Sequence, residues 1–189
     1  MSLFPLGLLS QGGGGASDGF ELISTTVLGS ATSSITLSSI PTTYTSLQLR
    51  IVGRSANATQ FDEISLRFNS DTGANYGHKY IELQTSNAPT QATATSQTAI
   101  RILGIPANTA TANNFAALKM DIIGYKNTNM KTNVRGFGGA ANFVSSWANS
   151  ASLFNGIWNV TTTVTSLTVA TWSGANLQTG TRVSLYGVL

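Results

Sequence analysis

Leu47-Gln48-Leu49-Arg50-Ile51 alternates apolar and polar side chains, and this pattern decides the fold class. A period of two places alternate side chains on opposite faces of a β-strand, whereas a helix needs apolar residues three and four positions apart. The leucines and the isoleucine are therefore expected to face a core, while Gln48 and Arg50 lie on an outer face. The segment predicts an antiparallel strand with one buried face.

The same alternation recurs between residues 20 and 189. Apolar residues with this spacing are Ile35/Leu37, Ile64/Leu66/Phe68, Leu118/Met120/Ile122, Leu167/Val169 and Val183/Leu185. Clusters rich in Asn, Ser, Thr and Gly lie between such segments, at residues 69–73, 107–114, 127–129, 155–156 and 173–176. Clusters of this kind are typical of turns. Short strands separated by turns along one chain predict an all-β domain, an antiparallel two-sheet sandwich.

Two segments depart from this pattern. Residues 86–98 are rich in Ala, Thr and Gln and poor in large apolar side chains, which predicts a long exposed loop or a weak edge strand. Residues 136–141 read Gly-Phe-Gly-Gly-Ala-Ala and lack the spacing of a phosphate-binding loop. We interpret this second segment as a strand bulge or as a place where neighbouring subunits approach closely.

The composition indicates a protein that is buried in an assembly. Charged residues are 9 % of the chain, against about 25 % in an ordinary domain. Interspersed charge keeps small domains apart, so a surface this poor in charge suits a subunit better than a dispersed monomer. The net charge is +3, and the densest basic group, Lys126, Lys131 and Arg135, is interpreted as solvated. We expect no nucleic-acid partner.

The first seventeen residues form a separate segment. Met1–Leu9 is apolar and carries no charged side chain, and residues 12–17 begin with four glycines, which favour a flexible tether. We therefore divide the chain into an N-terminal attachment arm with its glycine linker, residues 1–17, and a β-sandwich, residues 18–189. We expect the arm to dock into another protein through Leu3, Phe4, Leu6, Leu8 and Leu9.

Other interpretations of the arm fit less well. A secretory signal carries basic residues before its apolar run, and none precedes this one. A transmembrane helix needs about 20 apolar residues, more than twice the length of this run. We expect no membrane insertion. A terminal tail that binds nothing remains as an alternative.

Few residues suggest chemistry. His78 is the only histidine and the chain has no cysteine, so a histidine triad or a zinc site would rest on one residue. Asp62 and Glu63 are adjacent, so in a strand they point to opposite faces and do not flank one glycosidic bond. Asp71 is better suited to capping its turn than to binding a cation. We expect no enzymatic activity, no cofactor and no metal.

Tryptophan residues provide the one signal for a ligand. Trp147, Trp158 and Trp172 are able to stack on sugar rings while nearby amide side chains bind the sugar hydroxyls, a combination suited to glycans. Burial in the core or at subunit contacts accounts for the same residues more simply. Both interpretations stay open at this point.

Several strings resemble a group of small tailed-bacteriophage virion proteins. They are Phe20-Glu-Leu-Ile-Ser-Thr-Thr-Val-Leu-Gly29, Ser34-Ile-Thr-Leu-Ser-Ser-Ile-Pro41, Leu47-Gln-Leu-Arg-Ile51, Leu66-Arg-Phe-Asn-Ser-Asp-Thr-Gly-Ala-Asn-Tyr76 and Val183-Ser-Leu-Tyr-Gly-Val-Leu189. The resemblance covers nearly the whole body, and the arm resembles the attachment end of phage fibre subunits. It implies a jelly-roll-like sandwich and assembly into a homotrimer, and it carries no catalytic motif.

The resemblance and the arm together lead us to expect a non-enzymatic structural protein located in the virion. The leading expectation is a short tail fibre or baseplate-associated fibre subunit, whose partners are copies of itself and other tail or capsid proteins. A capsid decoration (cement) protein is one alternative. A module that binds a host-surface glycan is another.

Overall fold

The computed structural model describes residues 19–83, 88–141 and 150–189, which form strands and connecting turns and contain no helix. The strands are β1 (Phe20–Val27), β2 (Ser34–Leu37), β3 (Ser46–Gly53), β4 (Phe61–Phe68), β5 (Tyr76–Leu83), β6 (Pro89–Gln97), β7 (Ile100–Pro106), β8 (Ala116–Ile123), β9 (Thr132–Ala140), β10 (Ser150–Trp158), β11 (Leu167–Thr171) and β12 (Arg182–Val188). In these three ranges, no helix is long and apolar enough to cross a membrane.

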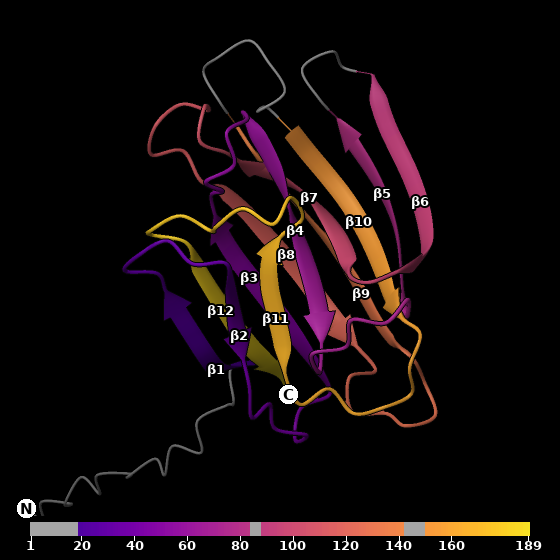
Figure 1. Ribbon diagram of the computed structural model, residues 1–189. Coiled ribbons are helices and arrows are strands. Elements are labelled where there is room, and N and C mark those ends of the chain that lie inside the picture. Colours follow the sequence, from indigo (N-terminus) through magenta and orange to yellow (C-terminus); the bar gives the residue numbers. More distant parts are fainter. Residues whose placement is uncertain (1–18, 84–87, 142–149) are drawn as a thin grey trace, which may run out of the picture.

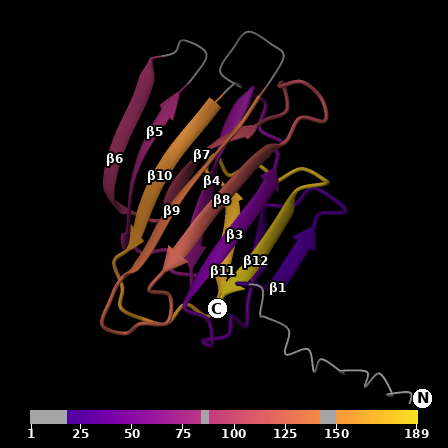
Figure 2. The ribbon, with the colours of Figure 1, turned by 180° about the vertical axis from the view of Figure 1, so that it is seen from behind.

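The strands form two antiparallel sheets of unequal size. The larger sheet has eight strands in the order β1-β12-β3-β8-β9-β10-β5-β6, and the smaller has four in the order β2-β11-β4-β7. The smaller sheet lies in front of the larger one in Figure 1, and the view from behind shows the broad face of the larger sheet (Figure 2). The predicted all-β sandwich is confirmed. Its jelly-roll character stays a prediction.

The core lies between the two sheets and follows the alternation in the sequence. In β3, Leu47, Leu49 and Ile51 are all buried, and Arg50 between them is exposed. The four-stranded sheet contributes residues such as Leu66 and Ile102 to the same cluster. Removal of these side chains from water is the main stabilising contribution, about 1.5–3 kcal/mol for each one fully buried.

Three segments whose structure the sequence left open, or assigned to turns, form strands that pair with their neighbours. Residues 86–98 contain the edge strand β6, which confirms one of the two predicted alternatives. The predicted turn at Asn155-Gly156 is wrong, because both residues pair on each side within β10. The bulge interpretation of residues 136–141 is also wrong for β9, which keeps a continuous register with β8 and β10. Ladder hydrogen bonds on both sides override local turn propensity.

A buried arginine organises the loop before β8. Arg54 is 4 % exposed, and its guanidinium donates to the backbone carbonyls of Thr111 at 2.7 Å, Asn114 at 2.9 Å and Ala110 at 3.0 Å. Burial lowers the pKa of Arg54 from its ordinary value. Because several carbonyls surround one planar donor group, the charge is solvated by the loop instead of by an acid.

Two tyrosines close the end of the sandwich beside the final strand. The Tyr125 hydroxyl accepts a hydrogen bond from the Tyr44 backbone N–H at 3.2 Å and donates to the Pro41 carbonyl at 2.9 Å. The Tyr44 ring lies against Gly187 of β12 so closely that a Cβ added to Gly187 would overlap three ring atoms. The ring therefore occupies the space that any other residue would fill.

Substituting Gly187→Ala is expected to destabilise the fold. The added methyl forces the buried Tyr44 ring out of its position, and overpacking of this kind costs about 1–3 kcal/mol. Gly29→Ala is the matched control, because a Cβ at Gly29 meets nothing within 4 Å. Urea unfolding of both variants measures the difference. An equal midpoint for the two would contradict the proposed packing of Tyr44 on Gly187.

Candidate functional site

The structure locates two of the three candidate glycan-binding tryptophans. Trp147 and the arm residues Leu3, Phe4, Leu6, Leu8 and Leu9 lie outside the described residues. Trp158 is 2 % exposed at the end of β10. Trp172 directly follows β11 and is half-buried.

Trp158 belongs to the core. Its ring packs against Phe68 and Tyr76, with ring centroids 5.7 Å and 6.4 Å away. Its indole Nε1 donates to Asp71 Oδ2 at 2.7 Å, and this bond is the main reason that the pKa of Asp71 lies below its ordinary value. Asp71 also accepts from the Gly73 N–H, so it caps its turn as expected. The Trp158 ring is buried, which favours the core interpretation over glycan binding for this residue.

Trp172 lies in a cluster where the two sheets meet, which we call the Trp172 cluster: Glu63, His78, Tyr80, Arg101 and Trp172. Arg101 on β7 binds Glu63 on β4 through two hydrogen bonds, Nε to Oε2 at 2.6 Å and Nη2 to Oε1 at 2.7 Å. The Arg101 guanidinium lies 5.3 Å from the centre of the Trp172 ring. One face of the Trp172 ring is therefore occupied by a side chain of the same molecule.

His78 joins this cluster from the larger sheet. It meets the edge of the Trp172 ring at 5.9 Å and stacks on Tyr80 at 6.4 Å. Its Nδ1 accepts a long hydrogen bond, 3.4 Å, from the Arg101 backbone N–H. Burial lowers the pKa of His78, and the positive charge of Arg101 lowers it further.

The contacts of the Trp172 cluster connect the four-stranded sheet to β5 of the eight-stranded sheet. The hydrogen bonds from Arg101 to the Glu63 carboxylate raise the pKa of Arg101, which favours the charged guanidinium. His78 is held neutral, and its Nδ1 serves as an acceptor for the backbone. The adjacent acid Asp62 has different partners, the hydroxyls of Ser55 and Ser173, both at 2.6 Å. Across the described ranges, no group of three or more His, Asp or Glu is placed to hold a metal ion.

The second candidate site is the outer face of the eight-stranded sheet, which points away from the smaller sheet (Figure 2). The exposed large apolar residues on this face are Phe20, Leu22, Val27, Val52, Ile81, Leu83, Phe137 and Leu153. They form two groups. Phe20, Leu22 and Val27 lie on the edge strand β1 and are called the β1 patch.

The second group is Ile81, Leu83, Phe137 and Leu153, which line a shallow groove over β5, β8, β9 and β10, called the outer groove, while Val52 on β3 lies outside both groups. One part has a volume of about 500 Å³ and the other about 600 Å³, and Ile81, Phe137 and Leu153 line both parts. Cross-strand pairing sets these three residues side by side, because Leu153 lies opposite Phe137 on one side and opposite Ile81 on the other. Phe137 is 55 % and Leu153 is 64 % exposed. Such clustering marks a binding surface, unlike apolar residues scattered singly.

Sequence reasoning missed the outer groove. Alternation identifies one apolar face, but Leu153 and Ile81 are apolar residues on the face that the pattern assigns to solvent. The available signal was the presence of large apolar residues at consecutive positions, as in Leu153-Phe154, which indicates that both faces of a strand are covered. The Glu63–Arg101 pair was also missed, because its partners are far apart in the sequence.

Neither a known protein family, nor a curated protein, nor a solved structure matches the chain. The resemblance to phage virion proteins therefore stays a prediction. The outer face of the larger sheet, together with the sequence of the arm, carries the functional argument.

Protonation of His78 is expected to destabilise the protein. The pKa of His78 in the folded state lies below its ordinary value of 6.5, so the unfolded chain binds more protons as the pH falls through that value. Its contribution to the free energy of unfolding is thus fully present above about pH 6.5 and declines below it. Urea unfolding at about pH 7.5 and about pH 5, a window in which few other side chains titrate, measures this decline.

His78→Gln is the control, because it removes the only titrating imidazole. The facing groups Arg101, Tyr80 and Glu82 stay in place in this variant. The decline in stability between the two pH values should shrink in His78→Gln. An equal decline in both proteins would assign the effect to another group.

Proposed function

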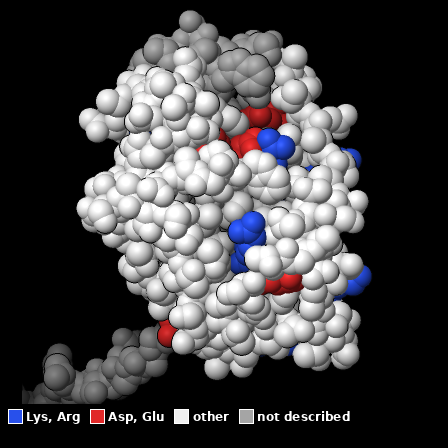
Figure 3. All heavy atoms as spheres, viewed as in Figure 1, with Lys and Arg blue, Asp and Glu red and all other residues white. Residues whose placement is uncertain are grey.

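We propose that this protein is a non-enzymatic structural subunit of a tailed-phage virion, a short tail fibre or baseplate-associated fibre subunit. The observation that carries the proposal is the outer face of the eight-stranded sheet, which has exposed apolar side chains and no second layer among the described residues. The opposite face of the body carries few charged side chains (Figure 3). Surfaces of this kind are unfavourable in a dispersed monomer and are suited to contacts between subunits.

Copies of the body associate through β1 in this proposal. β1 is an edge strand of the described sheet, so one side of its backbone is available for pairing. The β1 patch places Phe20 at 44 %, Leu22 at 53 % and Val27 at 54 % exposed on this same edge. An unpaired strand edge next to an apolar patch favours assembly into a homotrimer or another closed homo-oligomer.

The arm attaches this oligomer to the rest of the virion. Leu3, Phe4, Leu6, Leu8 and Leu9 each contribute about 1.5–3 kcal/mol if fully buried in a partner, before the cost of ordering the glycine linker. Because several copies of the arm are held in one oligomer, their combined binding exceeds that of a single arm. A short apolar segment is then sufficient for stable attachment.

Leu22→Glu is expected to weaken self-association. A charge in the β1 patch opposes burial of this edge against another copy, and the dissociation constant should rise at least about tenfold. Sedimentation velocity over a range of concentrations measures the change. Met130→Glu is the control, because Met130 is an exposed apolar residue in the turn before β9. A wild-type protein that stays monomeric at every concentration would contradict the proposal.

A double substitution, Leu8→Ser with Leu9→Ser, is expected to leave the body folded and to remove the protein from virions. The sandwich does not depend on these residues in our proposal, whereas attachment does. Circular dichroism of the purified variant and immunoblotting of purified particles measure the two effects, with Met130→Ser as control. Unchanged incorporation would count against the arm as anchor, and immunogold labelling of the capsid instead of the tail would favour a decoration protein.

A further inference from the structure

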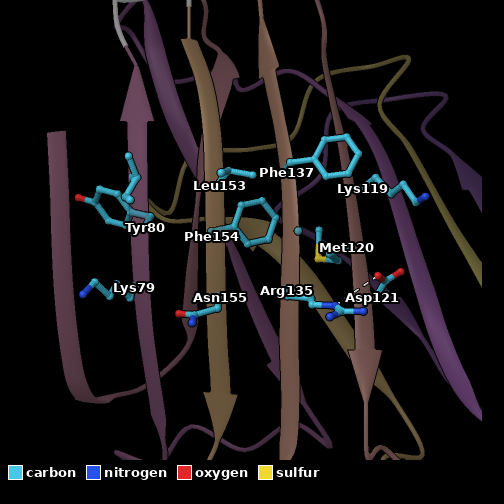
Figure 4. Close-up of a pocket in the computed structure, with 12 residues that line it drawn as sticks. Lys79, Tyr80, Lys119, Met120, Asp121, Arg135, Phe137, Leu153, Phe154 and Asn155 are labelled. Carbon is cyan, nitrogen blue, oxygen red and sulfur yellow. Dashed lines mark ion pairs between the residues drawn. The ribbon is translucent and has the colours of Figure 1, made fainter. Parts of the chain in front are cut away.

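The outer groove combines basic and apolar side chains in one shallow surface. Lys79 on β5 and Lys119 on β8 lie on opposite sides of it, and Arg135 on β9 lies between them beside Asp121 (Figure 4). The Arg135 Nε is 3.7 Å from Asp121 Oδ2, and both side chains are substantially exposed. This ion pair is weak in water, so Arg135 remains available to an incoming carboxylate.

The charge on the outer face is strongly one-sided. Its cations are Arg50, Lys79, Lys119, Arg135 and Arg182, and Asp121 is the one acid that the described strands place there. Arg50 is engaged with Tyr186, whose ring centre is 4.3 Å from the guanidinium, and with Gln48. Of the remaining cations, Lys79, Lys119 and Arg135 line the groove, and Arg182 lies farther away on β12. The groove is therefore complementary to a surface that carries acids.

Another copy of the body supplies few such acids. Asp62, Glu63 and Glu82 are at most 9 % exposed. Asp71 is bound by the Trp158 indole, by Asn75 and by the Gly73 N–H. Among the described acids only Glu21 is exposed to solvent. A copy of the body docked on the outer groove would bring cations to cations, so charge complementarity points to a different molecule.

The apolar part of the groove decides which class of molecule fits. Leu83, Ala117 and Ala151 line it together with Ile81, Phe137 and Leu153. Aliphatic side chains offer no hydrogen bonds to sugar hydroxyls, and Phe137 is the only aromatic residue among the described residues that line this part. A polypeptide segment matches both the basic and the apolar part of the groove. Its carboxylates reach Lys79, Lys119 and Arg135, and its apolar side chains cover Phe137 and Leu153.

We propose that the outer groove is the docking site for an acidic, apolar segment of a different protein. This inference rests on the proposed function only in assigning that partner to the virion. The glycine linker and arm of the chain contain no acidic side chain, so residues 1–17 match only the apolar half of the groove. The partner segment carries Asp or Glu at positions that alternate with, or flank, large apolar residues.

The test uses the full chain and a fluorescent peptide of about ten residues that alternates Asp and Leu, a length close to that of one strand. Two control peptides carry Lys in place of Asp, or the sequence of residues 1–9. Fluorescence anisotropy measures the affinities, and amide chemical shifts in the labelled protein locate the bound peptide. The Asp–Leu peptide should bind at least about tenfold tighter than either control and should shift residues around Phe137 and Leu153. Added salt should weaken its binding.

Lys119→Glu and Phe137→Ser are each expected to weaken this binding at least about tenfold. Lys126→Glu, which makes the same charge change in an exposed turn away from the groove, should leave it unchanged. Phe137 and Lys119 are exposed, so the variants keep the core intact, and the lysine variant serves even if Phe137→Ser folds poorly. No binding, or equal binding of the Lys–Leu peptide, would overturn the inference.

Two other results would also overturn it and name the true occupant. Displacement of the peptide by polygalacturonate at equal carboxylate concentration would assign the groove to an acidic polysaccharide. Loss of self-association in Phe137→Ser, without any binding of the Asp–Leu peptide, would assign it to a second copy. Failure of Leu22→Glu to affect association, by contrast, bears on the proposed function and leaves the groove untouched.

Discussion

The difference in size between the eight-stranded and the four-stranded sheet determines which strands are buried and which are exposed. A sheet of four strands covers the middle of the larger sheet and leaves its ends projecting. The consequence is visible in burial: every second residue of β8 is buried and β3 carries five buried residues, including Gly53, whereas β1 and β6 contain no buried residue. The projecting strands gain little from the core and depend on pairing with a single neighbour. Their free edges and exposed apolar side chains are therefore the natural places for contacts with other molecules.

Several charged side chains form their hydrogen bonds inside the molecule and are therefore not available at the surface. The bidentate Glu63–Arg101 pair, the Asp62 carboxylate with its two serine hydroxyls and the Arg54 guanidinium in its loop all satisfy their partners inside the molecule. Buried ion pairs add little net stability, because the loss of hydration offsets the attraction, but they penalise arrangements in which either partner is left alone. In a chain with only seven acids, this use of carboxylates leaves the outer face basic.

The sequence predicts the parts of the fold that rest on a simple period. The alternation around Leu47 and Leu49 places β3 correctly, because a period of two buries one face of a strand and would scatter the same leucines around a helix. Local turn chemistry fails at Asn155-Gly156, where pairing on both sides outweighs the preference of these residues for a turn. The environments of Trp158 and Trp172 could not be predicted from the sequence either. An indole ring suits a core, a contact between sheets or a ligand site equally well, and only its tertiary contacts show which of these it occupies.

The outer groove is fixed by the same constraint that fixes the core. A shift of one residue in the pairing of β9 with β10 would turn Phe154 out of the core and Leu153 into it, so burial of one face sets the register. That register then places Ile81, Leu153 and Phe137 in one row on the opposite face, without any contribution from their own burial. Pairing of β10 with a strand on each side fixes the backbone beneath this row, so its three residues are already side by side before a partner binds. The placement of this apolar row between cations is therefore a by-product of core packing, and in the proposed docking it would lower the conformational cost of binding.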